Sequence, residues 1–482
     1  MGVRTSAGGP ARRAAGVFGF LVLLAAFNTQ TCSQAAQAQA QASVTGRWQG
    51  KIAVAGGTLG IRVVLADAEG GGLAGTIDIP QQGATGLALR NVTREGDRVR
   101  FELPAGPGLA VFDGRLADGR IGGTFTQAGA AGTFSLSRAE AAAAEPAAPP
   151  GPPPPYREIE VRFASGPASL AGTLTLPAGA GPFPAVALLT GSGRQNRDEE
   201  LFGFKPFRII ADHFTRRGIA VLRWDDRGVG GSTGASPDNT TKDFAGDALA
   251  AIAWLSARAD IDDARIGLLG HSEGALAGVI AAAASREVDF LVLLAGPALP
   301  GEAILRAQGE TLARAGGPAA LEAVRRQQAL LFRAVRTGEG WDEVAAAARA
   351  GAGQGSGAGA ARSGARLEAA IQAQLRMARS GWFRYFLDYD PAPALRTLTM
   401  PILALSGALD TQVPAGPNAG ALRAAVAASG NADVTVKTYD GANHLFIPAK
   451  TGMPAEYATL EKTFVPGLLE DVSAWIAART RR

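Results

Sequence analysis

Cysteine is almost absent from this sequence of 482 residues, in which Cys32 stands alone. Because a disulfide needs two cysteines, no intrachain disulfide is expected and the fold depends on packing. Metal and nucleotide motifs with fixed spacing are also missing: there is no HExxH, no paired Cys/His spacing and no GxxxxGK(S/T). These absences argue against a zinc site and a P-loop. We expect neither a metal nor another cofactor.

Hydrophobic runs long enough to span a bilayer are missing as well. The apolar stretch at 14–27 is shorter than the ~18 to 20 residues that a membrane helix needs. It follows Arg12 and Arg13 and precedes small-residue repeats, which predicts a signal peptide over residues 1–42. A membrane anchor and twin-arginine export are the alternatives. We expect a periplasmic or secreted protein with no integral membrane segment after signal removal.

No strong excess of one charge is present. The chain has 47 Lys+Arg and 43 Asp+Glu, a formal net charge of +4. Three of the cations, Arg4, Arg12 and Arg13, lie in the signal segment, which has no acidic residue, so its removal leaves +1. This balance gives no reason to expect a nucleic-acid partner.

Residues 43–138 have the pattern of a small antiparallel β domain. Short runs alternate apolar and polar residues and are separated by turn signals, at 58–67, 73–80, 98–104, 110–118, 120–127 and 131–138. This spacing predicts a barrel or sandwich. No convergent catalytic set lies in it, so we expect a packing or positioning module, with glycan or substrate binding as the alternative.

A proline-rich stretch at 139–155 predicts a semi-rigid linker to a second domain at 156–482. That domain contains near-continuous apolar strands separated by helical stretches, with expected strands at 158–164, 169–177, 184–190, 219–224, 265–270, 289–295, 401–407 and 434–440. Buried strands that alternate with helices predict a mostly parallel sheet covered on both faces. Amphipathic helical patterns interrupt this rhythm at about 300–390, where we expect a helical cap.

Two serines match the pattern GxSxG. Ser272 follows a short apolar strand and precedes a small-residue helix, which is the strand, turn and helix order that a nucleophile elbow requires. Ser232 also fits the pattern, but it lies in a polar loop and fails this context test. The alternative for Ser272 is a serine that only caps the helix.

An acyl-transfer serine needs a base, and the chain has three histidines. His271 precedes the nucleophile, and we expect its side chain to point away from the groove that Ser272 faces. His213 lies in an expected helix, where a surface or helix-terminal role is the interpretation. His444 lies in a loop after the last expected strand, and it is our candidate general base.

The base needs a buried acceptor that holds it in one tautomer. Asp410 follows a hydrophobic strand and is our candidate for this role. Asp440 competes with it but lies only four residues before His444 and ends the last expected strand. The predicted catalytic set is therefore Ser272, Asp410 and His444, in that order along the chain.

This order, with "GHSEG" as the elbow, resembles the α/β-hydrolase superfamily over about residues 156–479. The runs "LLTGSGRQNRDEE" and "VLRWDDRGVGGSTG" are similar to an exported esterase and dienelactone-hydrolase-like branch related to serine aminopeptidases. The resemblance implies an α/β-hydrolase fold with a helical cap. It also implies an oxyanion hole formed by the backbone N–H groups of Ser192 and Glu273, although Thr190 stands where relatives carry histidine.

Other charged residues near these motifs are expected to be structural. We interpret Asp225, Asp226 and Arg227 as residues that organise the loop after their strand. Arg194 and Arg197 are in position to meet an anionic substrate, but a solvated loop face is the simpler interpretation.

The sequence therefore predicts a secreted serine hydrolase that cleaves a small-molecule carboxylic ester through an acyl-enzyme. One alternative is an aminopeptidase or other amidase on the same triad, with Glu273 as a candidate partner for a free α-amino group. Another is a non-catalytic binding protein, against which the intact set of three side chains argues. The sequence assigns no oligomeric state.

Overall fold

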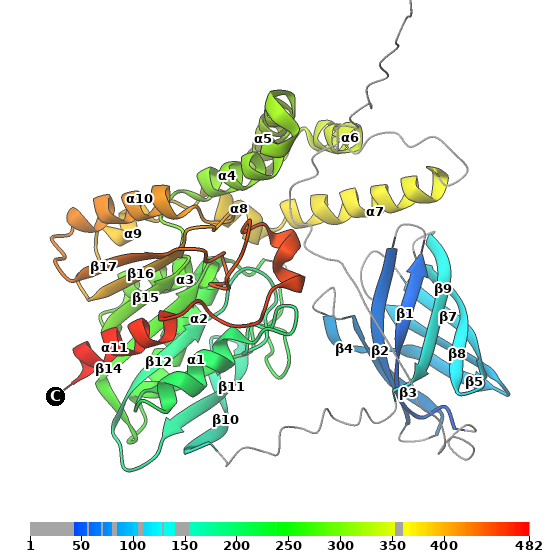
Figure 1. Ribbon diagram of the computed structural model, residues 1–482, viewed down its shortest axis with the longest axis horizontal. Helices are drawn as coiled ribbons and strands as arrows, with labels where there is room; N and C mark the ends of the chain where they lie inside the picture. The colour runs from blue at the N-terminus through cyan, green and yellow to red at the C-terminus, as the bar shows by residue number, and fades with distance from the viewer. Residues whose placement is uncertain are drawn as a thin grey trace, which may run out of the picture.

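The computed structural model describes residues 43–54, 57–68, 71–79, 84–104, 109–127, 130–139, 154–236, 238–351 and 360–481. The expected signal peptide and most of the expected linker lie outside these ranges. Figure 1 shows an N-terminal antiparallel sheet, in blue and cyan, and a larger part in which helices cover a second sheet.

The N-terminal sheet has nine antiparallel strands in the order β4-β3-β2-β1-β9-β8-β7-β6-β5. The strands are β1 (Gly46–Val54), β2 (Gly57–Asp67), β3 (Leu73–Ile79), β4 (Ala84–Ala88), β5 (Arg90–Glu95), β6 (Arg98–Pro104), β7 (Leu109–Ala117), β8 (Arg120–Gln127) and β9 (Ala130–Arg138). Leu89 alone separates β4 from β5. Because β4 pairs with β3 and β5 pairs with β6, this segment joins both edges and the sheet curls into a nearly closed barrel.

Aromatic side chains fill the centre of the barrel. The ring of Phe112 lies 4.6 Å from Phe101, 5.0 Å from Phe125 and 5.3 Å from Phe134, measured between centroids. Strands β1, β4 and β5 were not among the expected runs. Glycine and charge interrupt their apolar pattern; β5, for example, buries only Val92 among its six residues.

The second sheet has eight strands in the order β10-β11-β13-β12-β14-β15-β16-β17. They are β10 (Tyr156–Ser165), β11 (Ala168–Pro177), β12 (Phe183–Leu189), β13 (Ala220–Trp224), β14 (Ile261–His271), β15 (Phe290–Leu294), β16 (Ile402–Gly407) and β17 (Val434–Tyr439). Strand β11 is antiparallel to both of its neighbours, while the pairs from β13 to β17 are parallel. The prediction of a mostly parallel sheet is confirmed.

Alternate residues of the central strands pack against helices on opposite faces, as expected for buried parallel strands. One face, with Val186 and Leu269, packs against α1 (Pro206–Thr215) and α11 (Leu468–Thr480). The other face, with Ala187 and Leu268, packs against α2 (Thr241–Ser256), α3 (Glu273–Ala284), α9 (Ala392–Leu395) and α10 (Ala415–Ala427). The expected helical cover on both faces is present (Figure 1).

A helical cap lies between β15 and β16 in the chain, as expected. It consists of α4 (Gly301–Ala313), a 3-10 turn η3 (Arg314–Gly316), α5 (Gly317–Thr337), α6 (Trp341–Gly351), α7 (Ala360–Ala378) and α8 (Gly381–Asp388). Phe383 and Phe386 of α8 share a buried cluster with Leu276 of α3, so the cap packs against the helix that follows Ser272. A second 3-10 turn, η4 (Pro454–Thr459), precedes α11. Across the described ranges, no helix combines the length and apolar character that a membrane crossing requires.

Candidate active site

Ser272 lies in a sharp turn between β14 and α3. Its backbone has φ 54° and ψ −118°, a conformation that residues other than glycine rarely adopt. The flanking glycines make the turn possible: a Cβ on Gly270 would lie 2.2 Å from the carbonyl oxygen of Gly274, and a Cβ on Gly274 would lie 2.2 Å from that of Leu189. The strand, the strained serine and the helix therefore depend on glycine at both positions.

The hydroxyl of Ser272 does not act as a helix cap. Ser272 occupies the N-cap position of α3, but its side chain makes no capping hydrogen bond. Ser232, the other GxSxG serine, has a structural role instead. Its hydroxyl donates to the carbonyl oxygen of Asp225 at 2.7 Å and accepts the N–H of Ala171 at 2.9 Å.

His444 and Asp410 lie together in loops that follow the last two strands of the sheet. The Nδ1 of His444 lies 2.8 Å from Oδ2 of Asp410, and both side chains are buried. The other carboxylate oxygen of Asp410 accepts the N–H groups of Gln412 and Val413, each at 2.8 Å, which fixes the carboxylate plane. The competing acid Asp440 is exposed to solvent.

His271 lies closer to this pair than we expected. Its ring centroid is 4.8 Å from that of His444, and its Nε2 is 3.0 Å from the carbonyl oxygen of His444. His271 is buried and bonds the main chain of His444 rather than its ring nitrogens, so its side chain lies behind the proposed base, with the loop after β17 folded over the end of β14. His213 is at the end of α1, as expected, with Nε2 3.2 Å from the hydroxyl of Ser473.

The loop after β12 lies beside the elbow. A Cβ added to Gly191 would be 3.4 Å from the Cβ of Ser272. Thr190, which replaces the usual histidine, donates its hydroxyl hydrogen to Oδ1 of Asp226 at 2.7 Å. Among hydrogen bonds between described residues, the backbone N–H groups of Ser192 and Glu273 have no acceptor. Both predicted oxyanion donors are therefore unused by the protein.

Two carboxyl groups, one of them fully buried, lie next to the elbow. Oε1 of Glu273 accepts hydrogen bonds from the Thr241 hydroxyl and from the indole Nε1 of Trp382 in the cap, both at 2.7 Å. Its Oε2 is buried with no hydrogen-bond partner among the described residues. Burial raises the pKa of Glu273 and raises the pKa of Asp226 to about 8. The two side chains line a pocket of about 20 Å³ together with Thr190 and Gly191.

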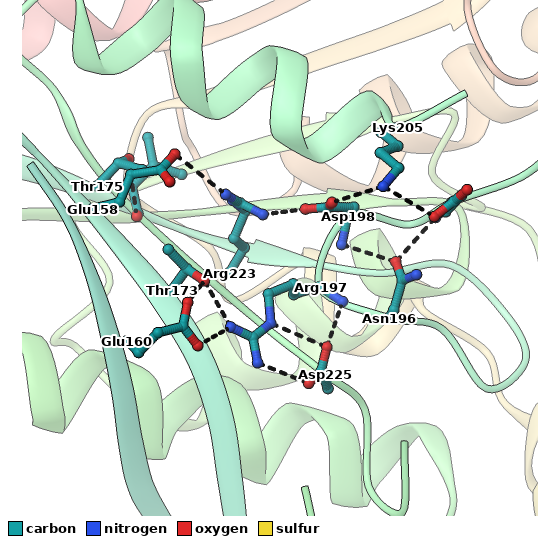
Figure 2. A network of polar contacts seen from close by, with 12 residues as sticks. Glu158, Glu160, Thr173, Thr175, Asn196, Arg197, Asp198, Lys205, Arg223 and Asp225 are labelled. Atoms are coloured by element: carbon teal, nitrogen blue, oxygen red, sulfur yellow. Dashed lines mark hydrogen bonds and ion pairs between the residues drawn. The ribbon is translucent and has the colours of Figure 1, made fainter. Parts of the chain in front are cut away.

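The charged residues of the neighbouring loops pair with one another (Figure 2). Arg197 lies 2.9 Å from Asp225 and 2.6 Å from Glu160. Arg227 lies 2.7 Å from Asp247. Asp225 and Arg227 thus organise loop structure, as expected. The solvated position expected for Arg197 is wrong, since its guanidinium is shared between two carboxylates.

Sequence reasoning missed Glu199 and the role of Trp382. Glu199 is 1% exposed and lies between two other acidic residues, so nothing in the pattern marks which of the three turns inward. Trp382 belongs to a cap helix whose docking the local pattern does not fix. Within the described ranges, no group of three or more His, Cys, Asp and Glu side chains is arranged to hold a metal ion.

The fold and the site together define a class. The strand order, the reversed second strand, a strained serine after the fifth strand and a histidine after the last are the features of an α/β-hydrolase. The chain belongs to the X-Pro dipeptidyl-peptidase family (S15), whose sequence profile matches residues 165–428, more than half of the chain. The resemblance to α/β-hydrolases related to peptidases is thereby confirmed.

Among characterised relatives, esterase EstD of Thermotoga maritima is 29% identical over 312 residues, which cover 64% of this chain and 65% of that protein. The chain thus spans slightly less than two thirds of its length. Among solved structures, the α/β-hydrolase GrgF from Penicillium sp. is 16% identical with a TM-score of 0.43, covering 67% of this chain and 99% of that one. The Pyrococcus furiosus esterase Pf2001 is 13% identical with a TM-score of 0.41, covering 67% and 90%.

Proposed function

We propose that this protein is a secreted serine hydrolase that cleaves carboxylic esters through an acyl-enzyme. The Ser272 oxygen attacks the ester carbonyl carbon while His444 takes the hydroxyl proton at Nε2. The tetrahedral intermediate then collapses, the ester C–O bond breaks, and His444 returns the proton to the departing alcohol. Water repeats the sequence on the acyl group and frees the acid and the serine.

The observation that carries this proposal is the contact of Asp410 with Nδ1 of His444 at 2.8 Å. A carboxylate accepts hydrogen bonds only, so it holds the hydrogen on Nδ1 and leaves the lone pair on Nε2. It also stabilises the imidazolium that forms when Ser272 loses its proton. The position of His271 supports the assignment, because it precedes Ser272 in the chain and its ring lies 4.8 Å from that of His444, measured between centroids.

The free backbone N–H groups of Ser192 and Glu273 support the assignment of an oxyanion hole. Glu273 is the first residue of α3, so its N–H points out of the helix N-terminus, where developing negative charge is stabilised. Removal of one such donor typically costs ~3 kcal/mol of transition-state stabilisation. The chemistry proposed here needs no cofactor and no metal, and its partner is a small-molecule ester. The proposed location, periplasmic or secreted, rests on the signal-like N-terminus.

An aminopeptidase or other amidase on the same triad is the second candidate. Oε2 of Glu273 favours it, because a buried carboxylate oxygen without a hydrogen-bond partner suits a substrate ammonium group. The family profile, described as X-Pro dipeptidyl-peptidase, also points to this chemistry. A simple ester has no ammonium group and can release its alcohol without a contact to Glu273. An aminoacyl substrate would use Oε2 of Glu273 to hold its free α-amino group.

Turnover of chromogenic esters of increasing acyl length, measured beside aminoacyl anilides, tests both candidates. We expect the native protein to hydrolyse short esters and Ser272→Ala to be inactive on every substrate. Turnover of anilides alone would replace the esterase assignment with the amidase one. Equal turnover by the native protein and by Ser272→Ala would remove Ser272 from the chemistry. No turnover in either protein would favour a binding function.

A further inference from the structure

A second buried acid–imidazole pair lies directly behind the elbow. The Nδ1 of His271 is 2.9 Å from Oε1 of Glu199, and neither side chain belongs to the proposed catalytic set. Both are nearly inaccessible, with side-chain exposures of 8% for His271 and 2% for Glu199. Burial of two ionisable groups is costly unless they are paired. The contact between Glu199 and His271 offsets that cost, and the question is what the buried pair does in the fold.

The hydrogen bonds around the ring of His271 determine its protonation. On one side, Nε2 meets the carbonyl oxygen of His444 at 3.0 Å, and a carbonyl oxygen has no hydrogen to give. On the other side, Nδ1 meets Oε1 of Glu199, which already accepts the N–H of Gly191 at 2.6 Å. With Glu199 as a carboxylate, acceptors lie at both nitrogens and both carry a hydrogen. His271 is then an imidazolium, and Glu199 is its counter-charge.

This pair connects the two loops that carry the proposed catalytic machinery. Glu199 holds the N–H of Gly191, which is the residue before the proposed oxyanion donor Ser192. His271 holds the carbonyl oxygen of the proposed base His444. Gly191 is packed tightly at this junction, since a Cβ there would lie 3.0 Å from Oε1 of Glu199 and 3.3 Å from Nδ1 of His271.

The segment that carries Glu199 is clamped by ion pairs on its other side (Figure 2). Asp198 pairs with Arg223 of β13, and Arg197 pairs with Asp225 at 2.9 Å. The side-chain oxygen of Asn196 accepts the N–H of Asp198 at 3.0 Å. These anchors hold Glu199 in a left-handed backbone conformation, φ 50°, which is costly for a residue with a side chain and persists only where its surroundings enforce it.

We propose that Glu199 and His271 form a charged positioning pair that aligns the oxyanion loop with the general base. The inference rests on the proposed function, since it assigns what the pair positions. Neither residue touches the reacting atoms. The pair acts through Gly191 on one side and through the main chain of His444 on the other.

The charges that face His271 favour this assignment. Burial lowers the pKa of His271, but the charge and hydrogen bond of Glu199, the carbonyl oxygen of His444 and the charge of Asp410 outweigh it, so that the pKa lies above its ordinary value. The proton therefore stabilises the folded state fully below pH ~6.5, and this contribution is lost as pH rises through the folded pKa. Activity is also expected to fall as pH rises through the folded pKa of His271.

Histidine-selective ¹⁵N labelling tests the protonation directly, because the chain has three histidines. We expect one ring with both nitrogens protonated near neutral pH, and we expect Glu199→Gln to convert it to a neutral ring. His213→Gln serves as the matched control that assigns the signals, because His213 lies on α1 away from the site. A His271 ring with one unprotonated nitrogen at neutral pH would overturn the charged pair.

Kinetics and the signals of His444 test the positioning role. Glu199→Gln keeps the shape of the side chain and removes its charge, so kcat is expected to fall by about 10²-fold with KM nearly unchanged. The alkaline limb of the pH profile is expected to move to lower pH. The Hδ1 resonance of His444 is expected to shift as well. Unchanged kcat together with an unchanged His444 signal would overturn the positioning role.

The two failures are distinguishable. If the native protein hydrolyses no substrate, the proposed function fails, but the ¹⁵N spectrum and the response of His444 to Glu199→Gln still decide whether the pair is charged and whether it positions the base. If the native protein is active and the spectrum shows a neutral His271, only the inference about the pair fails.

Discussion

The barrel and the hydrolase part of this chain differ in how they use buried charge. Among the described residues, the barrel buries one charged side chain, Glu102, whose carboxylate accepts a hydrogen bond from Asn91 at 2.7 Å. The hydrolase part buries nine Asp, Glu, Arg and His side chains: Glu199, Arg223, Asp225, Asp247, Asp262, His271, Glu273, Asp410 and His444. Since burial of a charge costs several kcal/mol unless partners offset it, the hydrolase part depends far more than the barrel on paired buried charges.

The positions of these groups sharpen the comparison. Asp225 follows β13, His271 ends β14, Asp410 follows β16 and His444 follows β17. These are the carboxyl ends of parallel strands, the edge at which open α/β sheets bind ligands. The barrel instead places aromatic rings at its centre. One sheet is thus built around a packed interior and the other around a polar edge.

The largest expected effect separates the two candidate acids of the site. Asp410→Asn keeps the shape of the side chain but favours the wrong tautomer of His444, so kcat is expected to fall by about 10⁴-fold. Asp440→Asn is the matched control, because Asp440 is exposed and should leave kcat unchanged. Steady-state ester hydrolysis with circular dichroism as a check of folding measures both. A larger loss in Asp440→Asn than in Asp410→Asn would reverse the assignment.

The second expected effect concerns stability rather than activity. Phe112→Ala removes a fully buried ring from the centre of the barrel and should lower the free energy of unfolding by about 4 kcal/mol. Leu109→Ala, on the same strand but 48% exposed, should change it by less than ~0.5 kcal/mol. Urea-dependent hydrogen exchange on barrel peptides measures the loss. Equal effects of the two substitutions would contradict the packed interior.

Sequence patterns predicted the second sheet better than the first. All eight strands from β10 to β17 were expected, because the inner ones are short apolar runs between turn signals and the edge strand β10 alternates apolar and polar residues. A barrel or a sandwich was expected for the first sheet, but the segment that closes the barrel, Ala84–Glu95, was not among the expected strands; it pairs with β3 at its start and with β6 at its end. Register between distant strands leaves no local signal in such a polar segment.

The same distinction applies to the site. Ser272, Asp410 and His444 were selected as candidates because motif context and the scarcity of histidine left few choices. Glu199 and Trp382 had no such signal. The inward turn of Glu199 depends on a left-handed backbone held by ion pairs, and the contact of Trp382 with Glu273 depends on how the cap packs. Both are properties of tertiary structure.

A third effect distinguishes two adjacent aspartates. Asp225→Asn removes the buried carboxylate that pairs with the partly buried guanidinium of Arg197 and should cost about 3 kcal/mol of folding free energy. Asp226→Asn should be neutral or stabilising above pH ~8. The amide oxygen accepts the N–H of Gln195, and the amide N–H₂ donates to the hydroxyl of Thr190, so both present contacts are kept. Chemical denaturation of each variant measures the difference.

Asp226 and Asp225 are expected to change the free energy of unfolding in opposite directions as pH rises. Burial raises the pKa of Asp226 to about 8, so between the unfolded pKa near 4 and this value the folded state holds the extra proton. The free energy of unfolding therefore falls as pH rises through this window, by up to about 1.4 kcal/mol per pH unit, and Asp226→Asn should remove that slope. The contribution of Asp225 to the free energy of unfolding changes with pH in the opposite direction. Burial raises its pKa, but Arg197 outweighs burial and lowers it, so its contribution is lost as pH falls.

The smallest expected effect compares the two GxSxG serines. Ser232→Ala removes one donated and one accepted hydrogen bond to the main chain, so it should lower the free energy of unfolding by about 1 kcal/mol and leave kcat unchanged. Ser272→Ala should abolish kcat and leave the free energy of unfolding nearly unchanged, because the hydroxyl of Ser272 makes no capping bond and its strained backbone stays as it is. Thermal melting and ester hydrolysis of both variants give the comparison. Because the motif is shared, only the surroundings of each serine explain opposite outcomes, and a loss of activity in Ser232→Ala without a loss of stability would contradict the structural role of Ser232.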